Sequence, residues 1–204
     1  MRILLSLLVL LAAPLAARAA DLEVSLKDAR GQPVPDAVVT YTPAQGAGRA
    51  SHFAWPPVMA QHNIAFEPHV LIVPVGADVT FPNQDTVRHD VYSFSPTKRF
   101  ELKLYGHEQA RTVHFDKAGV VAVGCNIHDR MAGFIIVVAT PYAAKTDANG
   151  RAVIADAPDG SGVLGVWQED QKAPGNAISR PIAVHGGARQ TLTLDLRPHP
   201  AMKM

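Results

Sequence analysis

One short stretch of this chain carries three side chains that bind soft metal ions. It has the sequence CNIHDRM and runs from Cys125 to Met131, with His128 three positions from each end. Cys125 is the only cysteine in 204 residues. A thiolate and a thioether select copper over hard cations, and imidazoles keep such a site able to hold Cu(II). The stretch therefore predicts three ligands of a copper site that exchanges single electrons.

A fourth ligand, a second histidine, has a candidate upstream. His89 lies in FPNQDTVRHDVYSF, between two segments that have the alternation of β-strands. In blue-copper sites two His and one Cys form a trigonal set, and a Met is a weak axial ligand. We therefore expect His89, Cys125 and His128 to be the equatorial ligands. Met131 is expected at the axial position.

The N-terminal residues predict export of the chain. Residues 1–19 combine Arg2, an apolar run from position 3 to 11 and Ala17-Arg18-Ala19, which is the pattern of a secretory signal peptide. The apolar run is too short for a membrane span. We expect a periplasmic mature chain without a membrane span. A solitary thiol there is open to oxidation, and coordination to a metal removes that hazard.

Charge and motifs exclude several classes of function. Without Arg2 and Arg18 the basic count falls from 19 to 17, against 18 acidic residues, so no basic excess predicts a nucleic-acid partner. The chain has no G-x-S-x-G, no H-E-x-x-H and no Gly-rich phosphate loop. Copper-dependent catalysis needs an open coordination position, which the Met131 ligand argues against. We therefore expect no enzyme.

The elements that must position these ligands have the pattern of an all-β protein. Short alternating segments are separated by regular turns, and no amphipathic helix of respectable length occurs, which indicates a Greek-key sandwich. In the middle of the chain, strands are expected at 66–73, 77–81, 88–94, 100–104, 111–115, 120–125 and 134–139.

The two ends of the chain predict a second sandwich. The segment 31–37 has the pattern G-x-P-V-x-D-A, and 146–150 has T-D-x-x-G before a Pro-Asp-Gly turn. These ends resemble the first and last parts of a carboxypeptidase-regulatory-like or CNA-B-like β-sandwich. The resemblance implies one flanking sandwich split by an inserted domain; a single barrel with decorated ends is the alternative. The expected divisions are a signal peptide (1–19), the first flanking part (20–50), the inserted domain (59–140), the second flanking part (141–197) and a flexible tail (198–204).

The middle segment resembles the cupredoxin family. The resemblance is carried by FPNQDTVRHDVYSF and VGCNIHDRMAGFIIVV, and the C-x2-H-x2-M spacing is similar to the short ligand loop of the amicyanin type. From Met59 to Pro141 the chain resembles the plastocyanin-like proteins labelled methylamine-utilisation proteins. The resemblance implies one type 1 copper ion and an electron carrier. Its partners would be a periplasmic dehydrogenase, a cytochrome or an oxidase.

Further roles follow from the same resemblance. Asn83 stands where related proteins keep an asparagine that ties the two ligand segments together. Asp90 stands where many cupredoxins have Asn or Ser, and a carboxylate there would favour the oxidised ion. Asn126 is expected to shape the ligand loop. The exposed edge of His128 would pass electrons through an apolar docking rim, which we expect to consist of Ile127, Ala132 and Gly133.

Alternatives remain open from the sequence. A non-redox envelope binding module and a periplasmic copper storage or handling protein are both compatible with a secreted β-rich chain. Additional copper ligands are conceivable at His69, at the set Met59, Gln61 and His62, and at the tail residues His199, Met202 and Met204.

Overall fold

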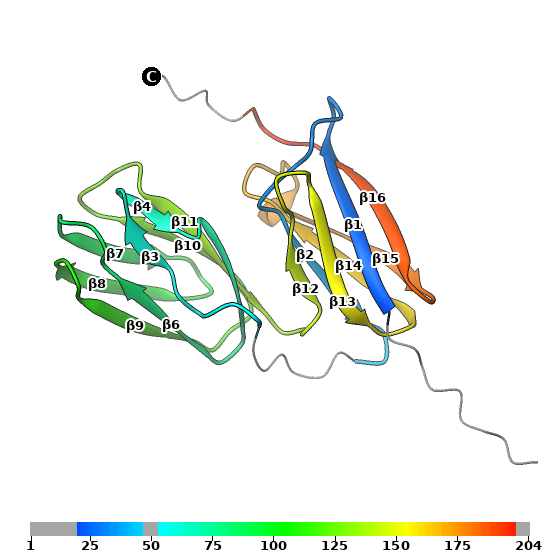
Figure 1. Cartoon of the computed structure of the whole chain (residues 1–204), viewed down its shortest axis with the longest axis horizontal. Helices are drawn as coiled ribbons and strands as arrows, with labels where there is room; N and C mark the ends of the chain where they lie inside the picture. The colour runs from blue at the N-terminus through cyan, green and yellow to red at the C-terminus, as the bar shows by residue number, and fades with distance from the viewer. Residues whose placement is uncertain (1–19, 47–52, 199–204) are drawn as a thin grey trace, which may run out of the picture.

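The computed structural model describes residues 20–46 and 53–198, and these residues form an all-β protein (Figure 1). Sixteen strands and one short 3-10 helix, η1 (Pro174–Asn176), make up the secondary structure of the described residues. The all-β prediction is therefore confirmed. The expected signal peptide and the tail histidine and methionines lie outside the described residues. None of the described residues belongs to a helix that is long and apolar enough to cross a membrane.

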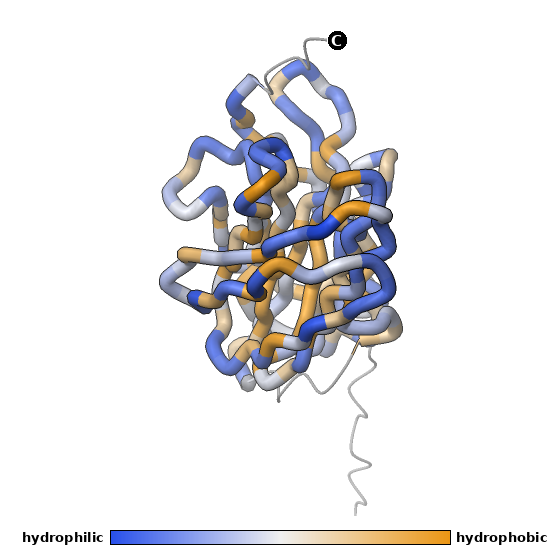
Figure 2. Tube along the Cα trace, turned by 90° about the vertical axis from the view of Figure 1, so that its left-hand side faces the viewer, coloured by the Kyte–Doolittle hydropathy of each residue, from blue (hydrophilic) through white to orange (hydrophobic). Residues whose placement is uncertain are grey.

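The middle of the chain forms a sandwich of its own, which we call the middle module (left in Figure 1). Its strands are β3 (Ala60–His62), β4 (Ala65–Glu67), β5 (Val70–Pro74), β6 (Ala77–Pro82), β7 (His89–Phe94), β8 (Arg99–Tyr105), β9 (Ala110–Phe115), β10 (Gly119–Cys125) and β11 (Ala132–Val138). Five strands form a sheet in the order β5-β11-β10-β7-β8, while β6 pairs with β9 and β3 with β4. The inward side chains of these sheets share one hydrophobic core. Figure 2 views this module from its outer side, where hydrophobic and hydrophilic positions alternate along the strands.

The two ends of the chain share sheets with each other in what we call the flanking module. Its strands are β1 (Ala20–Asp28), β2 (Val38–Pro43), β12 (Ala143–Lys145), β13 (Arg151–Ala157), β14 (Gly160–Trp167), β15 (Ala177–Val184) and β16 (Ala188–Leu194). One sheet has the order β13-β1-β16 and the other β12-β2-β14-β15. Because β1 runs parallel to β16, the first and last strands lie side by side. The residue limits predicted for the domains stay a prediction.

Two departures from the expected strands have a local cause. The strand expected at 66–73 is divided into β4 and β5 at Pro68 and His69, because proline has no N–H to offer a ladder. β15 is not among the strands predicted from the sequence, and Pro181 lies inside it. It is the edge strand of its sheet, where a proline is tolerated.

The modules pack on each other through β5 and β11. In β11, Ile135 and Val137 enter the core of the middle module, while Ile136 and Val138 belong to a separate cluster with Trp167 of the flanking module. This explains why FIIVV has no polar positions, since a strand buried on both faces loses its alternation. Each large aliphatic side chain buried there contributes about 1.5 to 3 kcal/mol. The flanking module therefore supports the strand that follows the predicted ligand loop.

Candidate metal centre

His89 and Cys125 reach the same core because each lies in phase with the buried positions of its strand. In β7, His89 and Val91 are buried, and in β10, Val123 and Cys125 are buried. Side chains two residues apart in a strand point to the same face. Cys125 lies opposite Val91 in the antiparallel β7–β10 pair. Neighbouring strands thus place an imidazole and a thiol together inside a closed core.

The turn after β10 brings His128 back over the cysteine. The backbone N–H of Met131 donates to the carbonyl of His128 at 2.9 Å, and the N–H of Cys125 donates to the carbonyl of Met131 at 3.2 Å. These bonds close the seven-residue loop on itself. His128 is half-buried, whereas His89 is fully buried and Cys125 is 4% exposed. His128 is therefore the one of these three side chains that is nearest to solvent.

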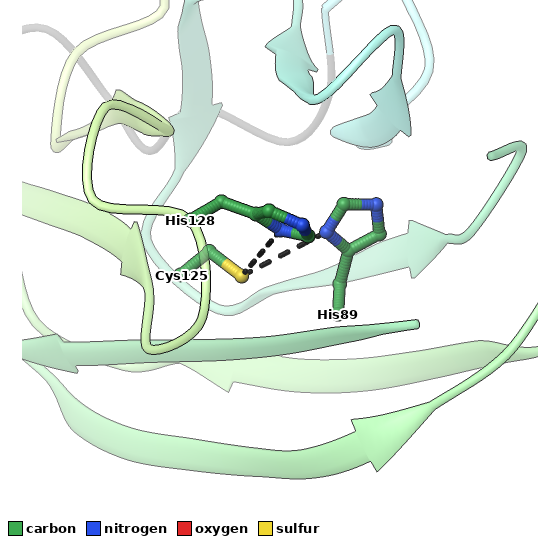
Figure 3. A group of neighbouring side chains, drawn as sticks. All are labelled: His89, Cys125 and His128. Atoms are coloured by element: carbon green, nitrogen blue, oxygen red, sulfur yellow. Dashed lines mark hydrogen bonds between the residues drawn. The ribbon is translucent and has the colours of Figure 1, made fainter. Parts of the chain in front are cut away.

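The three side chains converge with a spacing that suits a metal ion (Figure 3). The sulfur of Cys125 lies 3.7 Å from Nδ1 of His89 and 3.6 Å from Nδ1 of His128. All three ligand atoms lie within 4.8 Å of one another. Imidazole and thiolate ligands of a similar ion, Zn²⁺, lie about 2.0 to 2.3 Å from the metal, which separates neighbouring ligands of a trigonal set by about 3.6 Å. The two sulfur–nitrogen distances therefore suit a trigonal N₂S site.

A carboxylate holds the outer nitrogen of His89. Nε2 of the ring lies 2.8 Å from Oδ2 of Asp85, four residues earlier. Because a carboxylate only accepts, this bond places the proton of a neutral ring on Nε2 and leaves the lone pair of Nδ1 directed toward the sulfur. A carboxylate behind a ligating imidazole orients the ring and raises its basicity. Asp85 is not among the site residues predicted above, although an acid four residues before a candidate ligand in a loop is a signal for it.

Asp85 is itself fixed by the turn between β3 and β4. Its carboxylate accepts the backbone N–H of Asn63 at 2.6 Å and that of Ile64 at 3.0 Å. Burial alone would raise the pKa of Asp85, but the N–H groups of Ile64 and Asn63 and the ring of His89 outweigh it. The pKa of this carboxyl therefore lies below its usual value. One side chain thus connects the first hairpin of the module to a ligand histidine.

The tie between the two ligand segments differs from the one expected. Asn83 is buried, but its amide donates to the carbonyls of Val87 and Tyr105, and no hydrogen bond joins its side chain to the cysteine loop within the described residues. The expected tie by Asn83 is therefore wrong. Its amide instead shapes the loop before His89. The tie is made by Asn126, whose amide donates to Oδ1 of Asp90 at 3.0 Å and whose N–H donates to the Asp90 carbonyl at 3.0 Å.

Met131 lies beside Cys125 and His128, to which its backbone is hydrogen-bonded. It is 2% exposed and packs in the same hydrophobic cluster as Cys125. The two residues also line one surface groove together with Tyr92 and Phe94. The placement of Met131 is compatible with an axial thioether, and that role stays a prediction.

The further copper ligands weighed from the sequence have other contacts. Both ring nitrogens of His69 have partners, the carbonyl of Ala132 at 3.2 Å and the carboxylate of Glu169 at 3.1 Å. Met59 is fully buried in the hydrophobic core, and the ring of His62 lies 3.1 Å from a Glu67 oxygen. Within the described residues, the group of three or more His, Cys, Asp or Glu side chains that could hold a metal is the trio described above.

The expected docking rim requires one correction. Ile127 is 51% exposed and Ala132 is exposed, but Gly133 is buried. A side chain at Gly133 would meet the His69 carbonyl and the Cβ of Phe66, both at 3.1 Å. Gly133 thus permits close packing beneath β4 and is not part of the rim.

Part of this chain is similar, at low identity, to solved structures of known proteins. No family model and no curated protein matches the chain. Among solved structures, a purple cupredoxin from Nitrosopumilus maritimus is 24% identical, with 40% of this chain and 96% of that chain covered and a TM-score of 0.36. A Cu(I) methionine-to-glutamine variant of amicyanin is 27% identical, with coverages of 40% and 80% and a TM-score of 0.37. The strand order of the middle module and the convergence of its three candidate ligands stand independently of these likenesses. The middle module is a cupredoxin-like β-sandwich.

Proposed function

We propose that this chain binds one type 1 copper ion and carries single electrons between redox partners. The convergence of the His89, Cys125 and His128 ligand atoms carries the proposal, because both sulfur–nitrogen distances suit a trigonal set and all three atoms lie within 4.8 Å of one another. A copper ion in such a site alternates between Cu(I) and Cu(II), which supplies one-electron exchange. His89 and Cys125 are held by strands, and the loop of His128 is closed by its own hydrogen bonds, so the ligands need little rearrangement.

The proposal assigns different tasks to the two histidines. His89 is fully buried and held by Asp85, so it anchors the site. His128 is half-buried and adjoins the exposed Ile127, so it is the edge through which electrons enter and leave. The exposed side chain of Ile64 lies in the turn between β3 and β4, which holds Asp85. The exposed side chain of Val87 lies in the loop between β6 and β7, which precedes His89. We include them in the apolar surface that a redox partner would contact, since weak redox encounters use small interfaces.

The setting of the proposal follows from the sequence. The signal-like residues 1–19 favour the periplasm, where a dehydrogenase, a cytochrome or an oxidase would be the partner. An axial Met131 would occupy the coordination position that a substrate needs, which argues against copper-dependent catalysis. We therefore propose a carrier and not an enzyme.

A titration with Cu(II) tests the proposal. The purified chain without residues 1–19 should bind one equivalent of Cu(II), develop an intense blue or green charge-transfer band and lose the colour reversibly with ascorbate. A colourless protein that takes up several Cu(I) ions would support copper storage instead. A chain that binds neither ion would leave the envelope-module alternative.

A further inference from the structure

The flanking module reaches the predicted ligand loop through a bridge of two side chains. The carboxylate of Glu169, which follows β14, contacts Nε2 of His69 at 3.1 Å. Nδ1 of His69 contacts the carbonyl of Ala132 at 3.2 Å. Ala132 is the residue directly after Met131. The bridge thus joins residues from three distant segments and ends one residue from a predicted ligand.

Both partners of the His69 ring are hydrogen-bond acceptors. A carbonyl and a carboxylate offer no proton, so both contacts are hydrogen bonds only when both ring nitrogens carry a proton. The hydrogen bond to Glu169 raises the pKa of His69, while burial opposes the rise. The charge of Glu169, the Ala132 carbonyl and the charge of Asp36 raise it further. The bridge is therefore complete with an imidazolium and a carboxylate.

Each end of the bridge is held in place. Trp167 of the flanking module packs on Phe134 of β11 with a ring separation of 5.0 Å. The Glu169 carbonyl accepts Nη2 of Arg197 at 3.1 Å, which fixes its loop. The backbone N–H of Phe134 donates to the His69 carbonyl at 2.8 Å. The carboxylate and the ring thus meet because both backbones are already in position.

We propose that Glu169 and His69 are positioning residues for the metal loop, through which the flanking module holds the Met131 end of that loop. The inference rests on the proposed function insofar as the loop binds copper. Loss of the ring proton leaves one N–H for two acceptors, so one contact becomes a repulsion between lone pairs. The bridge therefore couples the loop to proton binding at a site outside the ligand set.

Other charged groups near the bridge act on it less directly. The charge of Asp36, which belongs to the flanking module, acts on the His69 ring, and Asp36 is paired with Lys145 at 2.8 Å. Nζ of Lys145 also lies 3.4 Å from the carbonyl of Val70, the residue after His69. Asp36 favours the protonated ring and Lys145 opposes it. Because these two charges pair with each other, Glu169 is the dominant partner of the ring.

Glu169→Gln tests the bridge in the metal-free chain. The variant keeps the size of the side chain and removes the charge. NMR titration should show a lower pKa for His69 than in the wild type. Hydrogen exchange at the amides of Cys125 and Met131 should become faster by about threefold or more, as expected when a partly exposed charged contact is lost.

Asp78→Asn is the matched control. It removes a carboxylate that contacts His114 at 2.8 Å on the exposed β6–β9 pair, away from the loop. The control should leave the His69 titration and the exchange of the loop amides unchanged. Glu169→Gln values equal to those of the wild type would overturn the proposal. If Glu169→Gln does not fold, exchange in the wild type decides, because loop protection must fall as His69 loses its proton.

The reduction potential of the copper-loaded protein supplies an independent test of the bridge. A cation near the site favours Cu(I) over Cu(II), so the reduction potential should fall as pH rises through the His69 transition. In Glu169→Gln that fall should occur at a lower pH, and the same pH profile in both proteins would contradict the bridge. A wild type that never becomes coloured would refute the copper proposal, while the metal-free exchange and titration would still decide on the bridge.

Discussion

Asp85→Asn is the sharpest perturbation of the candidate metal centre. One carboxylate oxygen accepts the N–H of Asn63, and the other accepts both the N–H of Ile64 and Nε2–H of His89. An amide has a single acceptor oxygen, so its NH₂ group must face at least one of these donors. Either orientation breaks one or two hydrogen bonds in a position whose side chain is only 11% exposed. His89 then loses its fixed tautomer or the hairpin turn loses its anchor.

The size of the effect follows from these contacts. Removing the outer partner of a ligating histidine lowers metal affinity by about 10- to 100-fold. This loss corresponds to about 1.4 to 2.7 kcal/mol of binding free energy. The metal-free protein should also lose about 1.5 to 3 kcal/mol of unfolding free energy, because a hydrogen-bonded charge is replaced. The reduction potential should rise, since a negative charge behind the ligand favours Cu(II).

Three measurements decide the outcome. Cu(II) affinity is measured by competition with a chelator, unfolding by urea titration of the metal-free chain, and the potential by redox titration. Asp78→Asn again serves as the control, because it removes an exposed carboxylate that contacts a histidine outside the trio. Wild-type affinity and potential in Asp85→Asn would refute the role assigned to Asp85 behind His89.

Four further outcomes are expected. Cys125→Ser should abolish the charge-transfer colour, and a variant that stays coloured would overturn the ligand set. Met131→Leu should retain copper with a raised reduction potential, since a weaker axial donor stabilises Cu(II) less. An unchanged or lower potential in a redox titration would contradict this expectation. Asp90→Asn should raise the potential because a carboxylate near the site is removed, and a potential that does not rise would count against the effect. Because the pKa of His69 is raised in the folded state, the protonated ring contributes to the free energy of unfolding. This contribution is fully present below about pH 6.5 and is lost as pH rises through the higher folded-state pKa. The difference in urea midpoint between wild type and Glu169→Gln should therefore be larger at low pH than at high pH. A difference that is the same at both pH values would contradict this prediction.

Several features of the site followed from local patterns. Cys125, His128 and Met131 are close in sequence, so any turn after β10 had to keep them near one another. His89 was accessible to prediction because it begins a strand with buried residues at alternate positions. The strand period places Val91 and His89 on one face without knowledge of the partner strand.

Errors arose where the outcome depends on neighbours in space. The resemblance predicts the tie at Asn83, but Asn126 and Asp90 make it, because a sequence position does not say which of two nearby polar side chains faces the other ligand segment. Gly133 was placed in the docking rim because its position next to the loop does not reveal that β4 covers it. Local spacing alone leaves such choices open.

The sequence by itself determined the candidate donor residues, their order along the chain and the alternation that builds a β-sandwich, because these depend on residue type and on contacts within one strand or turn. Only the tertiary structure decided that Asp85 stands behind His89, that β5 and β11 are buried on both faces and that Glu169 meets His69 across 100 residues. The physical reason is that hydrogen bonds and packing act over a few ångströms. Which distant groups come within that range is set by the way the strands pair and the two modules pack.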